Sequence, residues 1–111
     1  MGTQVTKTPQ ARRDLVEIAD FIGRDSLRAA ERFLDAAEAA FGLLATMPEM
    51  GTLCDFQTPV AAGVRVWAIR GFENHLIFYC PRKNGVHVVR VIHATRDIRR
   101  LFGIDDGPER D

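Results

Sequence analysis

The side chains best suited to acid–base chemistry in this sequence are three histidines, His75, His87 and His93. Imidazole titrates near neutral pH, so each of them could take up or release a proton. His75 opens one predicted strand and His93 closes the next, and antiparallel pairing would bring these two close together. No spacing such as HxxxH joins the three, so no metal site is predicted. Histidines that are simply exposed or hydrogen-bonded at strand ends are the favoured interpretation.

Arginines are the second group that could carry chemistry. Arg65 and Arg90 lie in predicted strands, and Arg96 stands beside Asp97 at the start of a short predicted helix. An RNA-cleaving site needs a base for the 2′-hydroxyl, cations for the phosphate and an acid for the leaving oxygen. Arginine and histidine supply these groups, but without an evident arrangement. No Ser–His–Asp order, phosphate-binding glycine loop or carboxylate pair stands out.

Charge is unevenly distributed along a chain whose net charge is zero. Residues 61–100 hold eight basic and two acidic side chains, whereas residues 1–60 hold six basic and nine acidic ones. The basic sub-region indicates either an acidic or polyanionic partner or an ordinary solvated sheet surface, and charge alone leaves both open. Cys54 and Cys80 lack CxxC spacing and are expected to be free thiols.

The first half of the chain predicts two amphipathic helices. Thr8 and Pro9 form a good helix start, and residues 23–26 break the first helix. Asp25 or Ser26 can cap the second helix, and the proline at position 48 stops it. The second helix carries one apolar stripe, formed by Ala30, Phe33, Leu34, Ala37, Ala40, Phe41 and Leu44. Because the break is short, we expect an antiparallel helix hairpin with Phe33 and Leu34 in the core.

The second half predicts three strands, over residues 64–70, 75–80 and 86–92. Asn-Gly before the last of them is typical of a β-hairpin turn. Residues 5–7 could add an edge strand, residues 49–63 read as a loop, and Thr95 is expected to cap a last helix that ends near Gly103. The predicted fold class is α+β: an N-terminal antiparallel helix hairpin packed on a three- to four-stranded, mainly antiparallel sheet, with a short C-terminal helix.

The length of 111 residues fits one domain, which we place at residues 1–103, followed by a flexible tail at 104–111. No apolar run approaches the ~20 residues of a membrane span, and no signal peptide opens the chain. A cytoplasmic protein without membrane contact is therefore expected. The sequence predicts no cofactor.

The third strand is apolar on both sides of its pleat. Val86, Val88 and Ile92 are expected on one face, and Val89 and Val91 on the other. A sheet that is covered on one face alone should alternate apolar with polar residues. Either the chain itself covers both faces or the second face awaits a partner, and we favour the partner because nothing else in the chain obviously covers that face.

Several segments together resemble the RelE/ParE toxin superfamily, over about residues 5 to 102. Residues 11–22, 30–33 and 47–51 (ARRDLVEIADFI, AERF and MPEMG) resemble its helical half. Residues 63–65, 74–79 and 90–98 (GVR, NHLIFY and RVIHATRDI) resemble its sheet half, and the ParE branch in particular.

This resemblance implies a toxin of a type II toxin–antitoxin, or plasmid stabilisation, system that a ParD-like antitoxin neutralises. Such antitoxins combine a ribbon–helix–helix DNA-binding dimer with a segment that wraps the toxin, so DNA is contacted only through the complex. The residues expected to bind the antitoxin are Val89, Val91, Trp67 and Phe72. ParE-type toxins are associated with poisoning DNA gyrase, and the candidates for contact with that target are Arg65, Arg96, Arg99 and Arg100.

RelE-type relatives are instead ribosome-dependent mRNA nucleases. Arg65, His75 and Arg96 fall at places comparable to the catalytic residues of those enzymes. Trp67, however, stands where a second cation is often found, and Phe102 offers no phenol. These departures favour a gyrase inhibitor over an endoribonuclease, and therefore a protein that is not an enzyme. The pattern is also compatible with an inactive family member that only binds antitoxin, or with a generic interaction domain.

Overall fold

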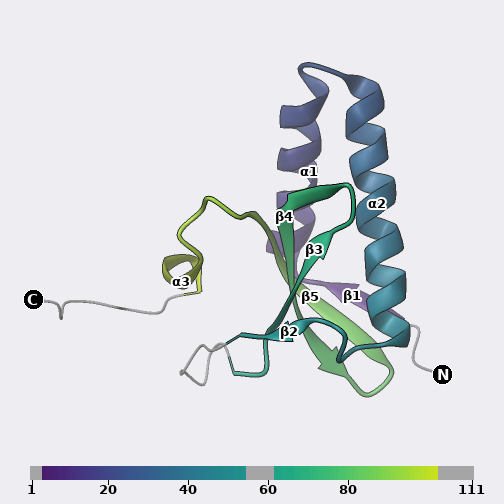
Figure 1. The fold of residues 1–111 in the computed structure, drawn as a ribbon, viewed down its shortest axis with the longest axis vertical. Coiled ribbons are helices and arrows are strands. Elements are labelled where there is room, and N and C mark those ends of the chain that lie inside the picture. The colour runs from purple at the N-terminus through teal and green to yellow at the C-terminus, as the bar shows by residue number, and fades with distance from the viewer. Residues whose placement is uncertain (1–3, 55–61, 103–111) are drawn as a thin grey trace, which may run out of the picture.

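The computed structural model describes residues 4–54 and 62–102, with the backbone but not the side chain of Arg99. Helices α1 (Pro9–Gly23) and α2 (Leu27–Thr46) pack as a hairpin on one face of a five-stranded sheet (Figure 1). The short helix α3 (Ile98–Leu101) packs on the opposite face. The predicted α+β class is confirmed, with more strands in the sheet than expected. The expected tail at 104–111 lies outside the described residues.

Both long helices begin at the predicted residues. Thr8 Oγ1 accepts a hydrogen bond from the Ala11 amide at 2.9 Å, and Ser26 Oγ accepts one from the Ala29 amide at 3.1 Å. Each bond satisfies one of the amides that a helix start leaves open. No helix in the described part of the chain is long and apolar enough to cross a membrane.

The apolar stripe of α2 covers the sheet, with one exception. Phe33 is fully buried, whereas Leu34 is 39% exposed, so the expectation that both lie in the core is wrong for Leu34. Successive residues of a helix point about 100° apart. That rotation carries Leu34 to the rim of the stripe while Phe33 stays at its centre.

The sheet has the strand order β1-β5-β4-β3-β2. β1 (Gln4–Lys7) pairs in parallel with β5 (Gly85–His93), and β4 (Phe72–Arg82), β3 (Arg65–Ile69) and β2 (Thr52–Leu53) follow as antiparallel neighbours. The expected edge strand is therefore present as β1. β2 lies in the segment that was expected to be a loop. A strand of two residues is too short to show an alternating pattern in the sequence.

A β-bulge in β5 changes which residues share a face. Tyr79 of β4 pairs with Val88, and its neighbour Phe78 pairs with Arg90, so Val89 has no partner in β4. An extra residue reverses the alternation of the pleat beyond it. Val91 consequently joins Val88 in the core beneath the helices. The expectation that Val89 and Val91 share an open face is wrong.

The outer edge of β5 is closed by α1 once β1 has ended. The Thr8 amide donates to Val88 O at 3.0 Å, and Thr8 Oγ1 donates to Val89 O at 2.7 Å. Further along, Asp14 Oδ2 accepts from the Val91 amide at 3.0 Å and from Arg90 Nε at 2.8 Å, while Asp14 Oδ1 accepts from Arg90 Nη2 at 3.0 Å. A helix side chain thus supplies the partners that a neighbouring strand would otherwise give.

The second face of the sheet is covered by the chain itself, but thinly. Val64, Phe78 and Ile92 are buried there, and Ile98, Leu101 and Phe102 from α3 and its end pack against them. The rings of Phe78 and Phe102 lie 5.2 Å apart between centroids. The favoured expectation that this face lacks any cover from the chain is therefore wrong. The last helix is capped by Asp97 and not by the expected Thr95, because Asp97 Oδ1 accepts from the Arg100 amide at 3.3 Å.

Candidate functional site

A hollow of about 470 Å³ opens where the β4–β5 ladder ends, and its lining consists of Gly71, Phe72, Glu73, Asn74, His75 and His93. His75 and His93 are register partners, as the sequence predicts, and their rings meet edge to face with 5.0 Å between centroids. The ring of His75 also packs against Phe33 of α2, with 5.2 Å between centroids. Its Nδ1 is buried and has no hydrogen-bond partner among the described residues.

These surroundings keep His75 neutral. Burial lowers the pKa of His75 below its ordinary value of 6.5, and the neighbouring imidazole of His93 lowers it further, while the backbone of Phe72 acts in the opposite sense. At pH 7 the side chain is therefore an uncharged ring inside a half-closed hollow. It lacks the positive charge that would hold a phosphate.

Arg65 is held in a structural role at the other end of the sheet. Its Nη1 donates to Glu49 O at 3.1 Å and to Gly51 O at 2.7 Å. On the neighbouring strand, Tyr79 Oη donates to Pro48 O at 2.7 Å and accepts from the Gly51 amide at 2.9 Å. These four bonds fix the segment that follows α2 onto the sheet. A Cβ at position 51 would collide with the Tyr79 hydroxyl, which explains the glycine there.

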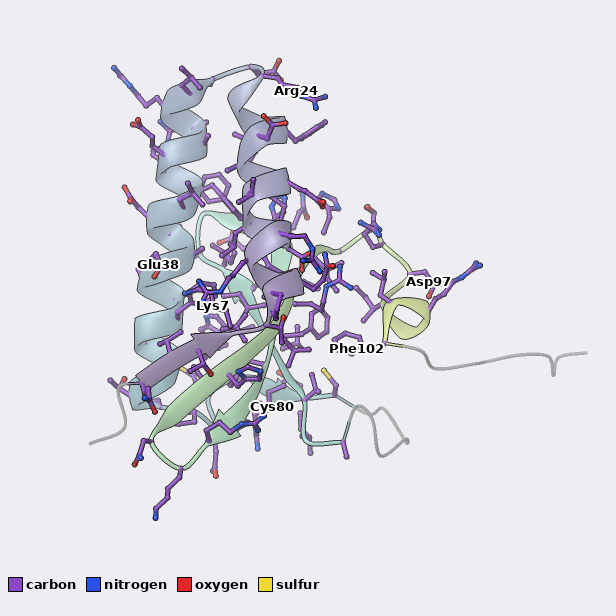
Figure 2. All side chains as sticks on the ribbon, turned by 180° about the vertical axis from the view of Figure 1, so that it is seen from behind. Lys7, Arg24, Glu38, Cys80, Asp97 and Phe102 are labelled. Carbon is purple, nitrogen blue, oxygen red and sulfur yellow. The ribbon has the colours of Figure 1, made fainter. Side chains whose placement is uncertain are left out.

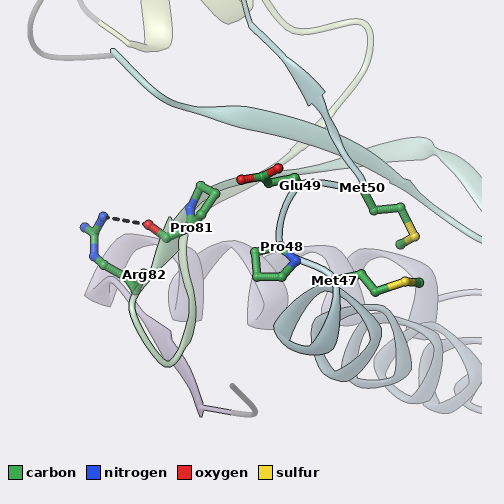
Figure 3. A pocket seen from close by; sticks show the side chains of 6 residues that line it. All are labelled: Met47, Pro48, Glu49, Met50, Pro81 and Arg82. Carbon is green, nitrogen blue, oxygen red and sulfur yellow. Dashed lines mark hydrogen bonds between the residues drawn. The ribbon is translucent and has the colours of Figure 1, made fainter. Parts of the chain in front are cut away.

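The segment after α2 also borders a shallow apolar hollow of about 510 Å³ (Figure 3). Its lining consists of Met47, Pro48, Glu49, Met50, Pro81 and Arg82. Arg82 Nη1 faces its neighbour's carbonyl, Pro81 O, at 3.5 Å. The hollow offers apolar surface with one charge of each sign and no histidine, so it suits docking better than acid–base chemistry.

The three residues that a nuclease would need do not converge. Arg65 pairs with Tyr79 in the ladder, whereas His75 lies four residues earlier on β4. At about 3.3 Å per residue, this places their backbones roughly 13 Å apart along the strand. Arg96 lies further off again, in the turn beyond His93. The guanidinium of Arg65 is moreover turned to Glu49 O and Gly51 O, so the structure does not gather the three side chains around one point.

Exposed positive charge lies on the turn between β5 and α3 and on α3 itself. Arg96 and Arg100 are both exposed, and the side chain of Arg99 lies outside the described residues. The turn is well defined by hydrogen bonds: the Arg96 amide donates to His93 O at 3.0 Å, and the Ala94 amide donates to Asn74 O at 2.7 Å. Figure 2 shows α3, with Asp97 and Phe102 labelled, beside the sheet and apart from the helix hairpin.

The residues predicted to bind an antitoxin are scattered in the structure. Val91 is buried in the main core, and Trp67 and Phe72 pack against that core from its edge. Phe72 also lines the hollow beside His75, and Val89 lines a different one, a cleft of about 370 Å³ on the second face of the sheet. The other lining residues of this cleft are Thr8, Val64, Cys80, Arg82, His87, Arg90, Leu101 and Phe102.

Large apolar side chains are exposed elsewhere, on the helix hairpin. Val16, Phe21 and Leu27 are 67%, 70% and 76% exposed. Phe21 and Leu27 flank the turn between α1 and α2. A search for apolar stripes misses these three because they lie outside the stripes, and a large apolar residue on a polar face was the signal that could have found them.

Asp14 is the other residue that the sequence patterns did not single out. It is 5% exposed, and burial alone would raise its pKa, but the hydrogen bonds from Arg90, Gln10 and the Val91 amide outweigh this and hold the pKa below its ordinary 3.8. An acidic residue within a helix is normally interpreted as exposed to solvent. No local pattern in the sequence indicates that the partner of Asp14 lies 76 residues away.

Known protein families and structures include clear relatives of this chain. The model of the ParE toxin of type II toxin–antitoxin systems, parDE, matches residues 5–98. The chain belongs to the ParE toxin family. It is also similar to Toxin RelE2 of Caulobacter vibrioides, with 34% identity over 93 residues that cover 84% of this chain and 97% of the relative.

A solved structure described as the chromosomal ParDE system from P. aeruginosa has the same fold, with a TM-score of 0.65. The match covers 83% of this chain and 96% of that one at 15% identity. At that identity the likeness concerns the fold alone. The protein is therefore a RelE/ParE-family toxin of a type II toxin–antitoxin system, with the helix hairpin and sheet of that family.

Proposed function

We propose that this ParE-family toxin stops growth by poisoning DNA gyrase, and that a ParD-like antitoxin with a ribbon–helix–helix DNA-binding domain neutralises it. In this proposal the chain acts by binding, without catalysis, and reaches DNA only through its complex with the antitoxin. The observation that carries it is the separation of Arg65, His75 and Arg96. A nuclease needs these groups on one phosphate, whereas a protein-binding toxin needs only an exposed surface.

The surface we assign to gyrase consists of the turn between β5 and α3, which carries Arg96, and of α3, which carries Arg100. Both side chains are exposed and can meet an acidic protein surface, and hydrogen bonds hold the backbone between them in one conformation. Arg65, which the resemblance also suggested, is held by two carbonyl groups and contributes less. A preformed cationic turn costs little conformational entropy on binding.

The surface we assign to the antitoxin is the exposed apolar set on the helix hairpin, Val16, Phe21 and Leu27. A disordered antitoxin segment that folds on binding needs apolar anchors of this kind. Burying one large apolar side chain contributes about 1.5–3 kcal/mol. Three such anchors account for tight binding without any change in the toxin core.

The target is tested with purified protein in two assays run in parallel. Supercoiling of plasmid by gyrase is measured beside a translation extract that is scored for mRNA cleavage. We expect loss of supercoiling and intact mRNA. The Arg96→Ala/Arg100→Ala double variant should be roughly 2- to 30-fold less potent, because each exposed charge pair contributes about 0.2–1 kcal/mol and the two effects add.

Arg28→Ala is the matched control, since Arg28 is an exposed arginine on α2 far along the chain from the turn. It should leave potency unchanged. Cleaved mRNA that disappears in the His75→Ala protein, with supercoiling untouched by the wild type, would overturn the proposal in favour of a RelE-like nuclease. Full binding of antitoxin without either activity would show an inactive family member.

The antitoxin surface is tested with the product of the small open reading frame beside the toxin gene. Phe21→Ser and Leu27→Ser should each weaken the complex at least about tenfold in a calorimetric titration, while the thermal midpoint of the free toxin stays nearly unchanged. Leu43→Ser is the control, because Leu43 is a partly exposed residue near the other end of α2. Equal loss in all three variants would mean that the hairpin turn is not the anchor.

A further inference from the structure

Three aromatic rings connect the core to the basic turn. Phe33 lies at the centre of the α2 stripe, the ring of His75 packs on it, and the ring of His93 packs on His75. Centroid distances of 5.2 and 5.0 Å are those of rings in direct contact. The three rings therefore form a continuous row of contacts from the core to the residue that precedes the turn.

His93 holds the turn through a nitrogen that must be unprotonated. The Thr95 amide donates to His93 Nδ1 at 3.1 Å, and Thr95 Oγ1 lies 2.8 Å from the same nitrogen. A nitrogen that accepts an N–H bond carries no proton, so the neutral ring has its hydrogen on Nε2. In the imidazolium form Nδ1 is itself a donor, and the Thr95 amide then faces another N–H group.

We propose that the His75–His93 pair is a pH-sensitive lock on the turn between β5 and α3. With both rings neutral, His93 accepts from Thr95, and the turn holds Arg96 and the start of α3 as the structure shows. Protonation removes that acceptor and places two like charges on rings that are in contact, so the turn is released. The lock concerns the conformation of the toxin and holds whichever target the toxin engages.

The described residues that line the hollow do not offset the added charge. From α2 the contact is the uncharged ring of Phe33, and from β4 the other lining residues are Phe72, Glu73 and Asn74. Among the described lining residues Glu73 is the one carboxylate, and its Oε2 already accepts from the Gly71 amide at 2.8 Å and faces Arg70. Two imidazolium rings would therefore repel each other across the ladder.

The direction of the effect follows from burial. Because folding lowers the pKa of His75, the folded state takes up its proton less readily than the unfolded chain. Stability is full above the unfolded pKa of 6.5 and falls as the pH drops from there toward the folded pKa. The lock is closed at neutral pH and opens in mild acid.

The test is a pH titration of the full chain by NMR, from about pH 7.5 to about pH 5, a range that brackets histidine ionisation. The measured quantities are the amide shifts of Thr95 and Arg96 and their hydrogen-exchange rates, corrected for the intrinsic effect of pH. In the wild type we expect both shifts to follow one titration. Exchange at the two amides should accelerate by roughly tenfold in acid, about what one lost hydrogen bond allows.

Two substitutions separate the lock from a merely structural role. In His93→Asn the amide oxygen takes the place of Nδ1 and accepts from the residue two positions on, as in an Asx turn, but it cannot titrate. This variant should keep Thr95 protected at every pH. His75→Phe keeps a ring against Phe33 and removes the like charge, so amide exchange at Thr95 should accelerate less in acid than it does in the wild type.

His87→Asn is the control, because His87 bonds Thr6 Oγ1 across the β1–β5 pair, far from the turn. It should leave the titration at Thr95 unchanged. A wild-type Thr95 signal that stays constant over the whole range would overturn the proposal. So would a His93→Asn protein that keeps the wild-type pH dependence.

Discussion

On one face of the sheet, two helices of 15 and 20 residues cover a core that includes Phe33, Phe41, Leu44, Ile77 and Tyr79. On the other face, a four-residue helix covers a much smaller cluster around Val64, Phe78 and Ile92. Buried apolar area is the main source of folding free energy. The first face therefore supplies most of the stability of the domain. Substitutions on the second face should change the folding free energy less.

The same division separates the surfaces assigned to function. The basic turn leads into α3, on the thinly covered side, and the exposed apolar anchors lie on the helices, turned away from the main core. Substitutions at either surface leave the thick core intact. A family built in this way can change its partners while keeping its fold.

The largest loss of stability is expected on the face of the sheet that α1 and α2 cover. Phe33→Ala removes a fully buried ring that contacts both Phe72 and His75. The free energy of unfolding should fall by roughly 3–5 kcal/mol, a large share of the stability of a small domain. Urea denaturation measures it, and a midpoint close to that of the wild type would contradict the assignment of this stripe to the core.

The next largest loss of stability is expected where Asp14 of α1 binds the outer edge of β5. Asp14→Asn should lower the free energy of unfolding by roughly 3 kcal/mol, because it removes the charge that Arg90 and the Val91 amide share. The wild-type contribution is present above the unfolded pKa of 3.8 and is lost as the pH falls through the lower folded value. The gap between variant and wild type should therefore narrow in acid, and a gap that is constant with pH would contradict it.

A smaller effect is expected where the sheet holds the segment after α2. Tyr79→Phe keeps the buried ring but loses the bonds to Pro48 O and the Gly51 amide. About 1–2 kcal/mol should be lost on thermal unfolding. Amide exchange at Gly51 should rise in the same variant. Unchanged exchange there would mean that Arg65 alone fixes the segment.

The smallest loss of stability is expected on the face of the sheet that α3 covers. Phe102→Ala removes a half-exposed ring that packs on Phe78. The loss should be about 1 kcal/mol, since only part of a large side chain leaves its contacts. Measured beside Phe33→Ala under the same conditions, it tests the comparison of the two faces directly. Equal losses would show that both faces stabilise the domain alike.

The sequence predicts much of this architecture because the signals are local. Thr8, Ser26 and the Asn84–Gly85 turn act within a few residues of where they stand, and the structure confirms each. The apolar stripe of α2 predicts which side of the helix is buried, with Leu34 as the exception. Leu34 directly follows the buried Phe33, and a step of one residue turns a helix side chain to another face.

The features that the sequence could not predict depend on distant partners. The bulge at Val89 shifts the register so that Val91 turns inward. At the same place Thr8 and Asp14, about 80 residues away in the sequence, form hydrogen bonds with the edge of β5. Alternation within the strand cannot reveal such an insertion. The pairing of His75 with His93 was predictable from the hairpin, but the use of His93 Nδ1 by Thr95 was not, since side-chain bonds in turns depend on the local backbone.

The close approach of Gly85 to Gln4 has a consequence for when the fold can be completed during synthesis. A Cβ at position 85 would collide with the Gln4 backbone, so the first strand lies tight against the start of β5. Joining them closes a loop of about 80 residues, at an entropic cost of roughly 4 kcal/mol. During synthesis the core cannot close until β5 has left the ribosome. Until then the ribosome carries an unfinished toxin, with its apolar helices already made and its turn still inside the exit tunnel.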